Sequence, residues 1–276
     1  DLEATFMRMK EDHMLNGQLK PAYNVQIAVE NYFIVHSYVS NDRTDYNTLI
    51  PVLEKHKEAF GEVLEEVTAD SGYCSEKNLL YLKENKIDSY IKLQDHEKRK
   101  TRAYSKDIGK YYNMKTMVFE DEQVYICHDG RELRHINTEK KEQNGYTQTY
   151  EVYGCSDCSG CEHKSKCLYK YNPDKDVDKN KVMKINEVWE ELREKSHANI
   201  QSEKGILKRQ TRSIQTEGHF GDIKENEDFR RFNYRSSDKV YKEFMLFAIG
   251  RNINKYHRFL YAKLKKFEGK AQEKTA

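Results

Sequence analysis

Residues 22–40 read AYNVQIAVENYFIVHSYVS, and this stretch decides the fold. Apolar side chains occupy alternate positions in two runs: Val25, Ile27 and Val29, then Phe33, Val35 and Val39. Such alternation is typical of strands that cover one apolar face. Asn31 lies between the runs and suits a turn. The stretch therefore predicts a β-hairpin.

Helices and further strands are expected after the hairpin. Asp45 can cap a helix in which Pro51 is tolerated in the first turn. The sequence LEEVTAD (64–70) then predicts a strand, Ser75 can cap a second helix, and SYIKL (89–93) predicts another strand. The order hairpin, helix, strand, helix, strand predicts an α/β fold with a mixed sheet covered by helices.

Composition limits the functional classes. Charged residues make up 34% of the 276 residues and hydrophobic residues 37%, and no apolar run reaches the roughly 18 residues of a membrane span. The first residue is Asp1 and no secretion leader follows, so we expect a cytoplasmic protein and a fragment of a longer one. Basic patches over 204–242 and 251–270 suit a polyanion, although a solvated helix face explains any single patch more simply.

Asp70 lies in ADSGYCSEKN (69–78), directly after an expected strand. Open α/β sheets build their ligand sites at the carboxyl ends of strands. Ser71 and Gly72 then permit a tight turn with the backbone close to a ligand. An ordinary Asp-Ser-Gly turn is the simpler interpretation when this stretch is taken alone.

A second stretch, RSIQTEGHFGDIKENEDFRRF (212–232), combines an acid with a base. Glu217 and Lys224 are seven residues apart, so on a helix they face the same side. A carboxylate that can hold a metal beside an ammonium that can hold a phosphate suits phosphodiester chemistry. A surface helix with a chance spacing is the alternative.

Together the two stretches resemble the aspartate and glutamate motifs of bacterial insertion-sequence transposases of the DDE superfamily. The resemblance continues through KPAYNVQIAVE (20–30) and FAIGRNINKYH (247–257). It implies an RNase H-like fold and metal-dependent DNA strand cleavage and transfer. Asp70 and Glu217 would be the second and third catalytic acids and ligands of Mg²⁺ or Mn²⁺. Residues implied to bind DNA are Lys224, Arg212 and Arg231.

The same resemblance implies partners and a location. The DNA would be the terminal inverted repeats of the element and the target DNA. The protein would form a homodimer in the DNA complex, without a membrane, and would be associated with the bacterial nucleoid when bound to DNA.

The first catalytic aspartate has no counterpart in this sequence. Family members carry it on the first strand, usually before Gly-Thr, whereas Asp1 resembles the sequence that follows that strand. We therefore expect the first strand to be missing, the Asp70 strand to have an open edge or a substitute partner, and the 276-residue chain to cleave no DNA. The main alternative is an inactive, zinc-stabilised DNA-binding remnant of such a transposase. A resolvase or nuclease of the same fold is weaker because a long insertion precedes Glu217.

Four of the six cysteines lie in CSDCSGCEHKSKC (155–167), and Cys127 precedes them. Paired Cys-x2-Cys spacing in a cytosolic chain favours zinc over disulfides, and the ferredoxin spacing is not matched. The resemblance selects four zinc ligands, which are Cys127, Cys158, Cys161 and Cys167. Cys155 is then left over, and its exchange with Cys167 stays open. We expect a structural site without an open position.

These assignments divide the chain into three parts. Residues 1–95 would begin the RNase H-like core, residues 96–185 would form the cysteine-rich insertion, and residues 186–276 would complete the core. The last helix carries apolar residues at three-four spacing, which should dock on the sheet. They are Leu246, Ile249, Ile253, Tyr256 and Leu260.

Overall fold

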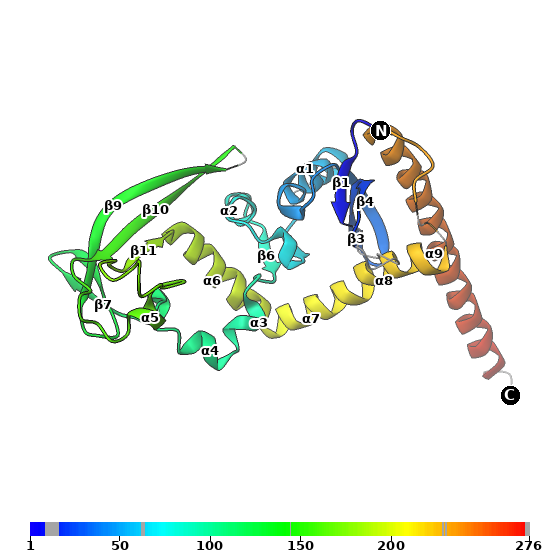
Figure 1. Ribbon diagram of the computed structural model, residues 1–276. Helices are drawn as coiled ribbons and strands as arrows, with labels where there is room; N and C mark the ends of the chain where they lie inside the picture. The colour runs from blue at the N-terminus through cyan, green and yellow to red at the C-terminus, as the bar shows by residue number, and fades with distance from the viewer. Residues whose placement is uncertain (9–16, 62–63, 144, 228, 230, 274–276) are drawn as a thin grey trace. The chain divides into compact units, whose positions relative to one another are not determined.

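The computed structural model describes residues 1–8, 17–61, 64–143, 145–227, 229 and 231–273. Its contacts divide the chain into two compact units, described separately here. Unit 1 comprises Asp1–Ile91 and Asn199–Ala276, and unit 2 comprises Lys92–Ala198. Within the described ranges, no helix is long and apolar enough to cross a membrane. Figure 1 shows the elements in chain order.

Unit 1 contains three two-stranded sheets and several helices. Its first half has the elements β1 (Thr5–Arg8), β2 (Leu19–Ala22), β3 (Asn24–Glu30), β4 (Phe33–Ser40), α1 (Leu49–Phe60), β5 (Glu66–Ala69), α2 (Glu76–Glu84) and β6 (Asp88–Ile91). Its second half has α7 (Glu203–Arg212), a π turn η4 (Ser213–Glu217), α8 (Gly218–Gly221), a π turn η5 (Asp222–Asn226) and α9 (Ser237–Glu273).

The predicted hairpin is confirmed as β3 and β4, which pair antiparallel. Asn31 and Tyr32 turn the chain with positive φ angles of 48° and 70°. The following helix begins at Leu49, so Pro51 lies in its first turn as expected. Ser75 caps α2 by accepting a hydrogen bond from the Asn78 amide. The strands at 66–69 and 88–91 pair in parallel.

Two asparagine side chains form hydrogen bonds with backbone groups of β4 and β6 in unit 1. Asn252 of α9 donates to the Ile34 carbonyl oxygen at 2.8 Å and accepts from the Ile34 amide at 3.0 Å. Asn199 donates to the Ser89 carbonyl oxygen of β6 at 3.1 Å. Among the described residues, β3 pairs only with β4, and β5 pairs only with β6. Within the described ranges, β3 and β5 therefore each have one edge without a strand partner.

The apolar stripe of α9 does not dock on the sheet, so that prediction was wrong. Leu246 is 72% exposed and Ile253 64% exposed, and the other three members of the stripe are also exposed. The buried face of α9 instead carries Val240, Phe244 and Ala248. Three-four spacing identified a helix with an apolar face, but it could not identify which face packs on β4.

Unit 2 is built on a five-stranded antiparallel sheet in the order β11-β10-β9-β8-β7. Its elements are α3 (His96–Arg99), α4 (Arg102–Ser105), a 3₁₀ turn η3 (Tyr111–Asn113), β7 (Lys115–Phe119), β8 (Glu122–Ile126), β9 (Glu132–Gln143), β10 (Tyr146–Cys155), α5 (Lys164–Cys167), β11 (Val182–Ile185) and α6 (Glu187–Gln201), whose last turn enters unit 1. The expected insertion over 96–185 lies within this unit. The two units together give a mixed α/β protein.

Candidate functional site

Asp70 lies where β5 ends, in unit 1. It is the residue after Ala69 and caps the 3₁₀ turn η2 (Ser71–Tyr73), because its Oδ1 accepts a hydrogen bond from the Ser71 amide at 2.7 Å. Its side chain is 58% exposed. The carboxylate is thus fixed at a strand end and open to solvent, which suits contact with a ligand.

Glu217 approaches Asp70 through a shared arginine. Nη2 of Arg212 lies 2.8 Å from Oε1 of Glu217 and 4.0 Å from Oδ1 of Asp70. Ser213 also donates from its hydroxyl to Oε2 of Glu217 at 3.0 Å. Two carboxylates far apart in the sequence are therefore gathered around one guanidinium. The Glu217 side chain is 58% exposed, so this acid also faces solvent.

The remaining predicted DNA contacts follow Glu217 along the chain. Lys224 is half-buried in η5, and Arg231 is exposed after it. The expectation that Glu217 and Lys224 face the same side assumed regular α-helix, and that assumption was wrong. The chain is α-helical over Gly218–Gly221 but forms a π turn over Asp222–Asn226, so seven residues do not equal two α-helical turns here.

Asp45 is a neighbour of this site that sequence reasoning treated only as a helix cap. Its Oδ1 accepts hydrogen bonds from Nδ2 of Asn24 and Nε2 of Gln26, both at 2.8 Å. A Cβ atom at Gly72 would lie 2.8 Å from Oδ2 of Asp45, so glycine is what lets the η2 turn pass this carboxylate. Nothing in the residue spacing marks that contact.

Tyr73 closes the region behind Asp70. Its hydroxyl donates to Oε1 of Gln26, which links η2 to β3. Burial raises the pKa of Tyr73, and the negative charges of Asp45 and Asp70 raise it further. The phenol therefore stays protonated at neutral pH and serves as a fixed hydrogen-bond donor.

The donor chemistry around Asp70 suits a hard cation, although its geometry is incomplete. Among the described residues, no group of three or more His, Cys, Asp or Glu side chains is arranged to hold a metal ion. Asp70 and Glu217 offer carboxylate oxygens, which Mg²⁺ prefers, and Arg212 provides positive charge between them. Asp1 is held elsewhere, since its Oδ2 accepts from the Tyr23 hydroxyl at 2.7 Å and the Ser236 amide at 3.2 Å.

A buried network holds the segment that carries Glu217. His219 in α8 is 3% exposed, and its Nε2 lies 3.0 Å from the Tyr32 carbonyl oxygen. Arg251 of α9 places Nη2 3.1 Å from Nδ1 of His219 and 3.1 Å from Oδ2 of Asp222. Nε2 therefore donates and Nδ1 accepts, which is the neutral imidazole. This network fixes α8 against the hairpin turn and α9.

Acid should weaken this network, and we expect unit 1 to lose stability as the pH falls through about 6.5. Burial lowers the pKa of His219, so the unfolded chain binds the proton more readily than the folded chain does. Urea unfolding at pH 7.5 and pH 5.5 measures the loss. His36, His96 and His197 also have lowered pKa values and add to the pH dependence of the wild-type protein. The unfolding free energy of His219→Gln should therefore depend less on pH than that of the wild type. An unchanged pH dependence in that variant would contradict the role given to His219.

Three cysteines of unit 2 pack in or against one apolar cluster. Cys155 and Cys158 are buried in a cluster with Leu133 and Tyr153, and Cys127 packs against that cluster. Burial raises the pKa of Cys167. All four predicted ligands are free thiols.

Two tight turns present these cysteines. The Gly130 amide donates to the Cys127 carbonyl oxygen at 3.0 Å, and the Cys161 amide donates to the Cys158 carbonyl oxygen at 3.4 Å. Arg131 joins the turns, because its guanidinium donates to the carbonyl oxygens of Asp157 at 2.8 Å and Ser159 at 3.0 Å. Thiolates are ligands that suit zinc, but among the described residues no three of these cysteines are arranged to hold an ion.

Comparison with protein families gives one match. Residues 126–257 match the family model described as the transposase DDE domain. The matched range includes Glu217, Arg212 and the cysteine cluster, and it excludes Asp70. No curated protein and no solved structure matches the chain significantly.

Proposed function

We propose that this chain is the catalytic portion of a DDE transposase, which cleaves DNA strands and transfers them during movement of an insertion sequence. The match of residues 126–257 to the transposase DDE domain is the premise. The observation that carries the proposal is the meeting of Asp70 and Glu217 around Arg212. One acid lies inside the matched range and the other outside it, yet the fold brings both to the same guanidinium.

Asp70 and Glu217 would hold Mg²⁺ or Mn²⁺. In sites of this class the ions activate the attacking oxygen and stabilise the leaving oxygen of an in-line displacement. Arg212 neutralises the two carboxylates at the site and can pair with a DNA phosphate instead. Lys224 and Arg231 would contact the DNA backbone beyond it. The substrates would be the terminal inverted repeats and the target DNA, bound by a homodimer.

The two open strand edges support an RNase H-like arrangement. By the resemblance, the strand with the first catalytic aspartate lies between the strands that correspond to β3 and β5. Among the described strands, both keep an unpaired inner edge. Tyr73, after β5, bonds Gln26 of β3, so the two edges belong to one neighbourhood. A strand in that position would place its aspartate beside Asp70.

The zinc site would be structural. Cys127, Cys158, Cys161 and Cys167 would supply four thiolates, which leave no open position for catalysis. Cys155 is better accounted for as a buried thiol, because its Sγ donates to the Asp157 carbonyl oxygen at 3.2 Å. The ion would connect the two cysteine turns.

The genomic DNA around the coding sequence tests the proposal directly. A transposase gene should lie between inverted repeats, and the reading frame should encode an Asp-Gly-Thr strand ahead of the hairpin. Absence of both features would contradict a transposase, whatever the geometry at Asp70.

An inactive DNA-binding remnant is the second candidate. The observation that favours it is that, within the described chain, two acids rather than three meet at Arg212. Both candidates bind DNA, but only the transposase cleaves it. The cleavage assay described in the Discussion separates them.

A further inference from the structure

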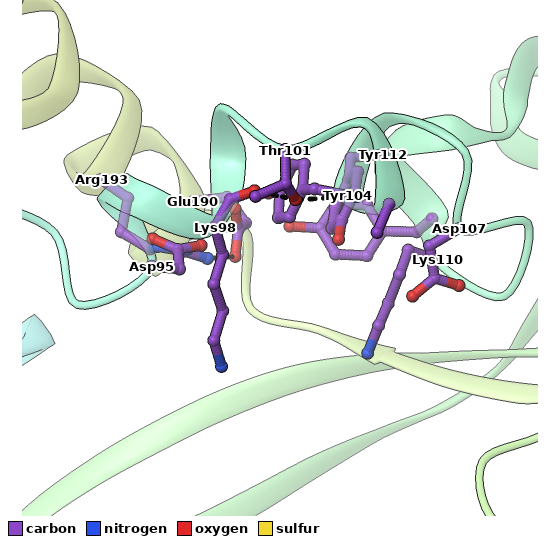
Figure 2. Close-up of a pocket in the computed structure, with 11 residues that line it drawn as sticks. Asp95, Lys98, Thr101, Tyr104, Asp107, Lys110, Tyr112, Glu190 and Arg193 are labelled. Atoms are coloured by element: carbon purple, nitrogen blue, oxygen red, sulfur yellow. Dashed lines mark hydrogen bonds and ion pairs between the residues drawn. The ribbon is translucent and has the colours of Figure 1, made fainter.

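A pocket in unit 2 is lined by a basic segment that contains three tyrosines (Figure 2). Residues 98–112 read KRKTRAYSKDIGKYY, in which six lysines and arginines face a single acid, Asp107. The segment lies before the range that matches the transposase domain. Its combination of cations and aromatic rings is typical of surfaces that bind nucleic acid.

Half-buried ion pairs hold the segment on α6. Arg99 lies 3.3 Å from Asp95 and 2.7 Å from Glu194, measured between nitrogen and carboxylate oxygen. Arg193 pairs with the same Asp95 and lies 2.8 Å from Glu190. The Arg99 side chain is 12% exposed and the Arg193 side chain 17% exposed. Asp95, Glu190 and Arg193 line the pocket, and their charges are paired with one another or with Arg99.

Four other cations of the segment face solvent. They are Lys98, Arg102, Lys106 and Lys110. None of these four cations forms an ion pair within 4.0 Å with another residue in the described part of the chain. Figure 2 shows the side chains of Lys98 and Lys110 extending to the same side of the pocket, with tyrosine rings between them. Charges placed in this way can contact successive phosphates of a backbone.

The tyrosines supply ordered ring faces. Tyr104 and Tyr112 are stacked, with ring centroids 4.4 Å apart and planes 10° from parallel. Tyr111 meets Tyr112 edge to face and bonds Glu190 of α6, so the rings are fixed to the same helix as the ion pairs. Tyr112 is 39% exposed. A further flat ring can stack on such an array without rearranging it.

We propose that this pocket binds single-stranded DNA, with an unpaired base against the Tyr104–Tyr112 stack and the flanking phosphates on Lys98 and Lys110. The proposal rests on the proposed function only for the choice of DNA as the nucleic acid. It assigns unit 2 a second task beside zinc binding, which is to hold a DNA strand whose bases are unpaired. Duplex DNA hides its ring faces inside the stack and cannot use the tyrosines.

The test measures binding of dye-labelled oligonucleotides to the full chain by fluorescence anisotropy. The probes are dT20, an oligonucleotide of about 20 thymidines, and the dA20·dT20 duplex at equal salt, and loss of the Tyr112 ring should weaken binding of dT20 but not of the duplex. Tyr112→Ala should weaken dT20 binding about tenfold, whereas Tyr112→Phe, which keeps the ring, should restore most of it. Tyr169→Ala is the matched control, because Tyr169 is 82% exposed elsewhere in unit 2.

The phosphate contacts are tested separately by salt dependence. The double variant Lys98→Gln with Lys110→Gln changes only exposed side chains, so it should fold normally. For dT20, the slope of log K against log salt should become shallower by about 1.4, or 0.7 for each lost contact. The control double variant Lys175→Gln with Lys195→Gln removes the same charge from exposed positions and should keep the slope.

The outcomes separate this inference from the transposase proposal. Equal weakening of duplex and dT20 binding by Tyr112→Ala, tighter binding of rU20 than dT20, or equal losses in pocket and control variants would overturn it. Tyrosine-dependent binding of dT20, with no Mg²⁺-dependent cleavage by the protein that also carries the Asp-Gly-Thr strand, would support the pocket and count against the transposase. Cleavage by that protein, without tyrosine-dependent binding of dT20, would support the transposase and overturn the pocket.

Discussion

Replacing Cys161 by serine should release zinc from unit 2 and abolish the cooperative thermal unfolding of that unit. Structural zinc contributes about 10–16 kcal/mol to the folding of small zinc domains, more than most single domains have in reserve. Little regular structure supports the cysteine-containing turns of unit 2, since the helix that ends at Cys167, α5, has only four residues. Loss of one thiolate would leave three ligands for an ion that prefers four.

Elemental analysis and calorimetry of protein purified without chelator measure the effect. Wild-type protein should contain one zinc ion per chain, and Cys161→Ser should contain far less. Cys155→Ser is the matched control, because Cys155 is buried beside the same cluster yet is not among the proposed ligands. Wild-type protein without zinc, or a coloured protein with iron, would contradict the zinc site. Equal loss of zinc in both variants would place Cys155 among the ligands.

The second large effect is expected at Glu217. In a protein that also carries the Asp-Gly-Thr strand, Glu217→Ala should reduce Mg²⁺-dependent cleavage of element-end DNA by on the order of 10³-fold or more. Metal ions in such sites contribute several kcal/mol to stabilising the transition state, and each 1.36 kcal/mol is tenfold in rate. Removing a metal ligand therefore removes most of the activity.

Glu225→Ala provides the control for this assay. Glu225 is an exposed acid eight residues further on, in η5, and is not assigned to the site. It should retain cleavage, and circular dichroism should show both variants folded. Full activity of Glu217→Ala would exclude Glu217 as a metal ligand. Robust cleavage by the 276-residue chain would show that an acid such as Asp45 or Asp1 completes the site.

Local sequence rules predicted much of unit 1 because its elements depend on local chemistry. Alternating apolar residues and Asn31 gave the hairpin, and Ser75 gave the start of α2. The long strands β9 and β10 were missed. The polar and charged residues of β9, ELRHINTEKKEQ, carry little of the apolar alternation by which strands are recognised, whereas the Tyr, Thr and Val residues of β10 do favour a strand. β9 and β10 are strands because they pair with each other and with neighbouring strands, and such pairing cannot be recognised from a local residue pattern.

The residues of the candidate site could be predicted from the sequence, but the hydrogen bonds and ion pairs between them could not. The position of Asp70 after a strand followed from the order of elements, and Glu217 followed from resemblance. The guanidinium between them was not foreseen, although Arg212 itself was assigned to DNA. The contacts of Asp45 with Asn24 and Gln26 depend on tertiary packing, which no spacing rule contains.

The π turn η4 determines where Glu217 points, and this has a consequence for insertions and deletions. A π turn holds one residue more than the α-helix needs over the same length. Deleting Gln215 would allow the chain to run on from α7 as regular helix, with Arg212 and the glutamate four residues apart, so the two side chains would stay adjacent. Inserting one residue there would instead rotate the glutamate by about 100° away from Arg212. A deletion of one residue between Arg212 and Glu217 should therefore be tolerated more readily than an insertion of one residue.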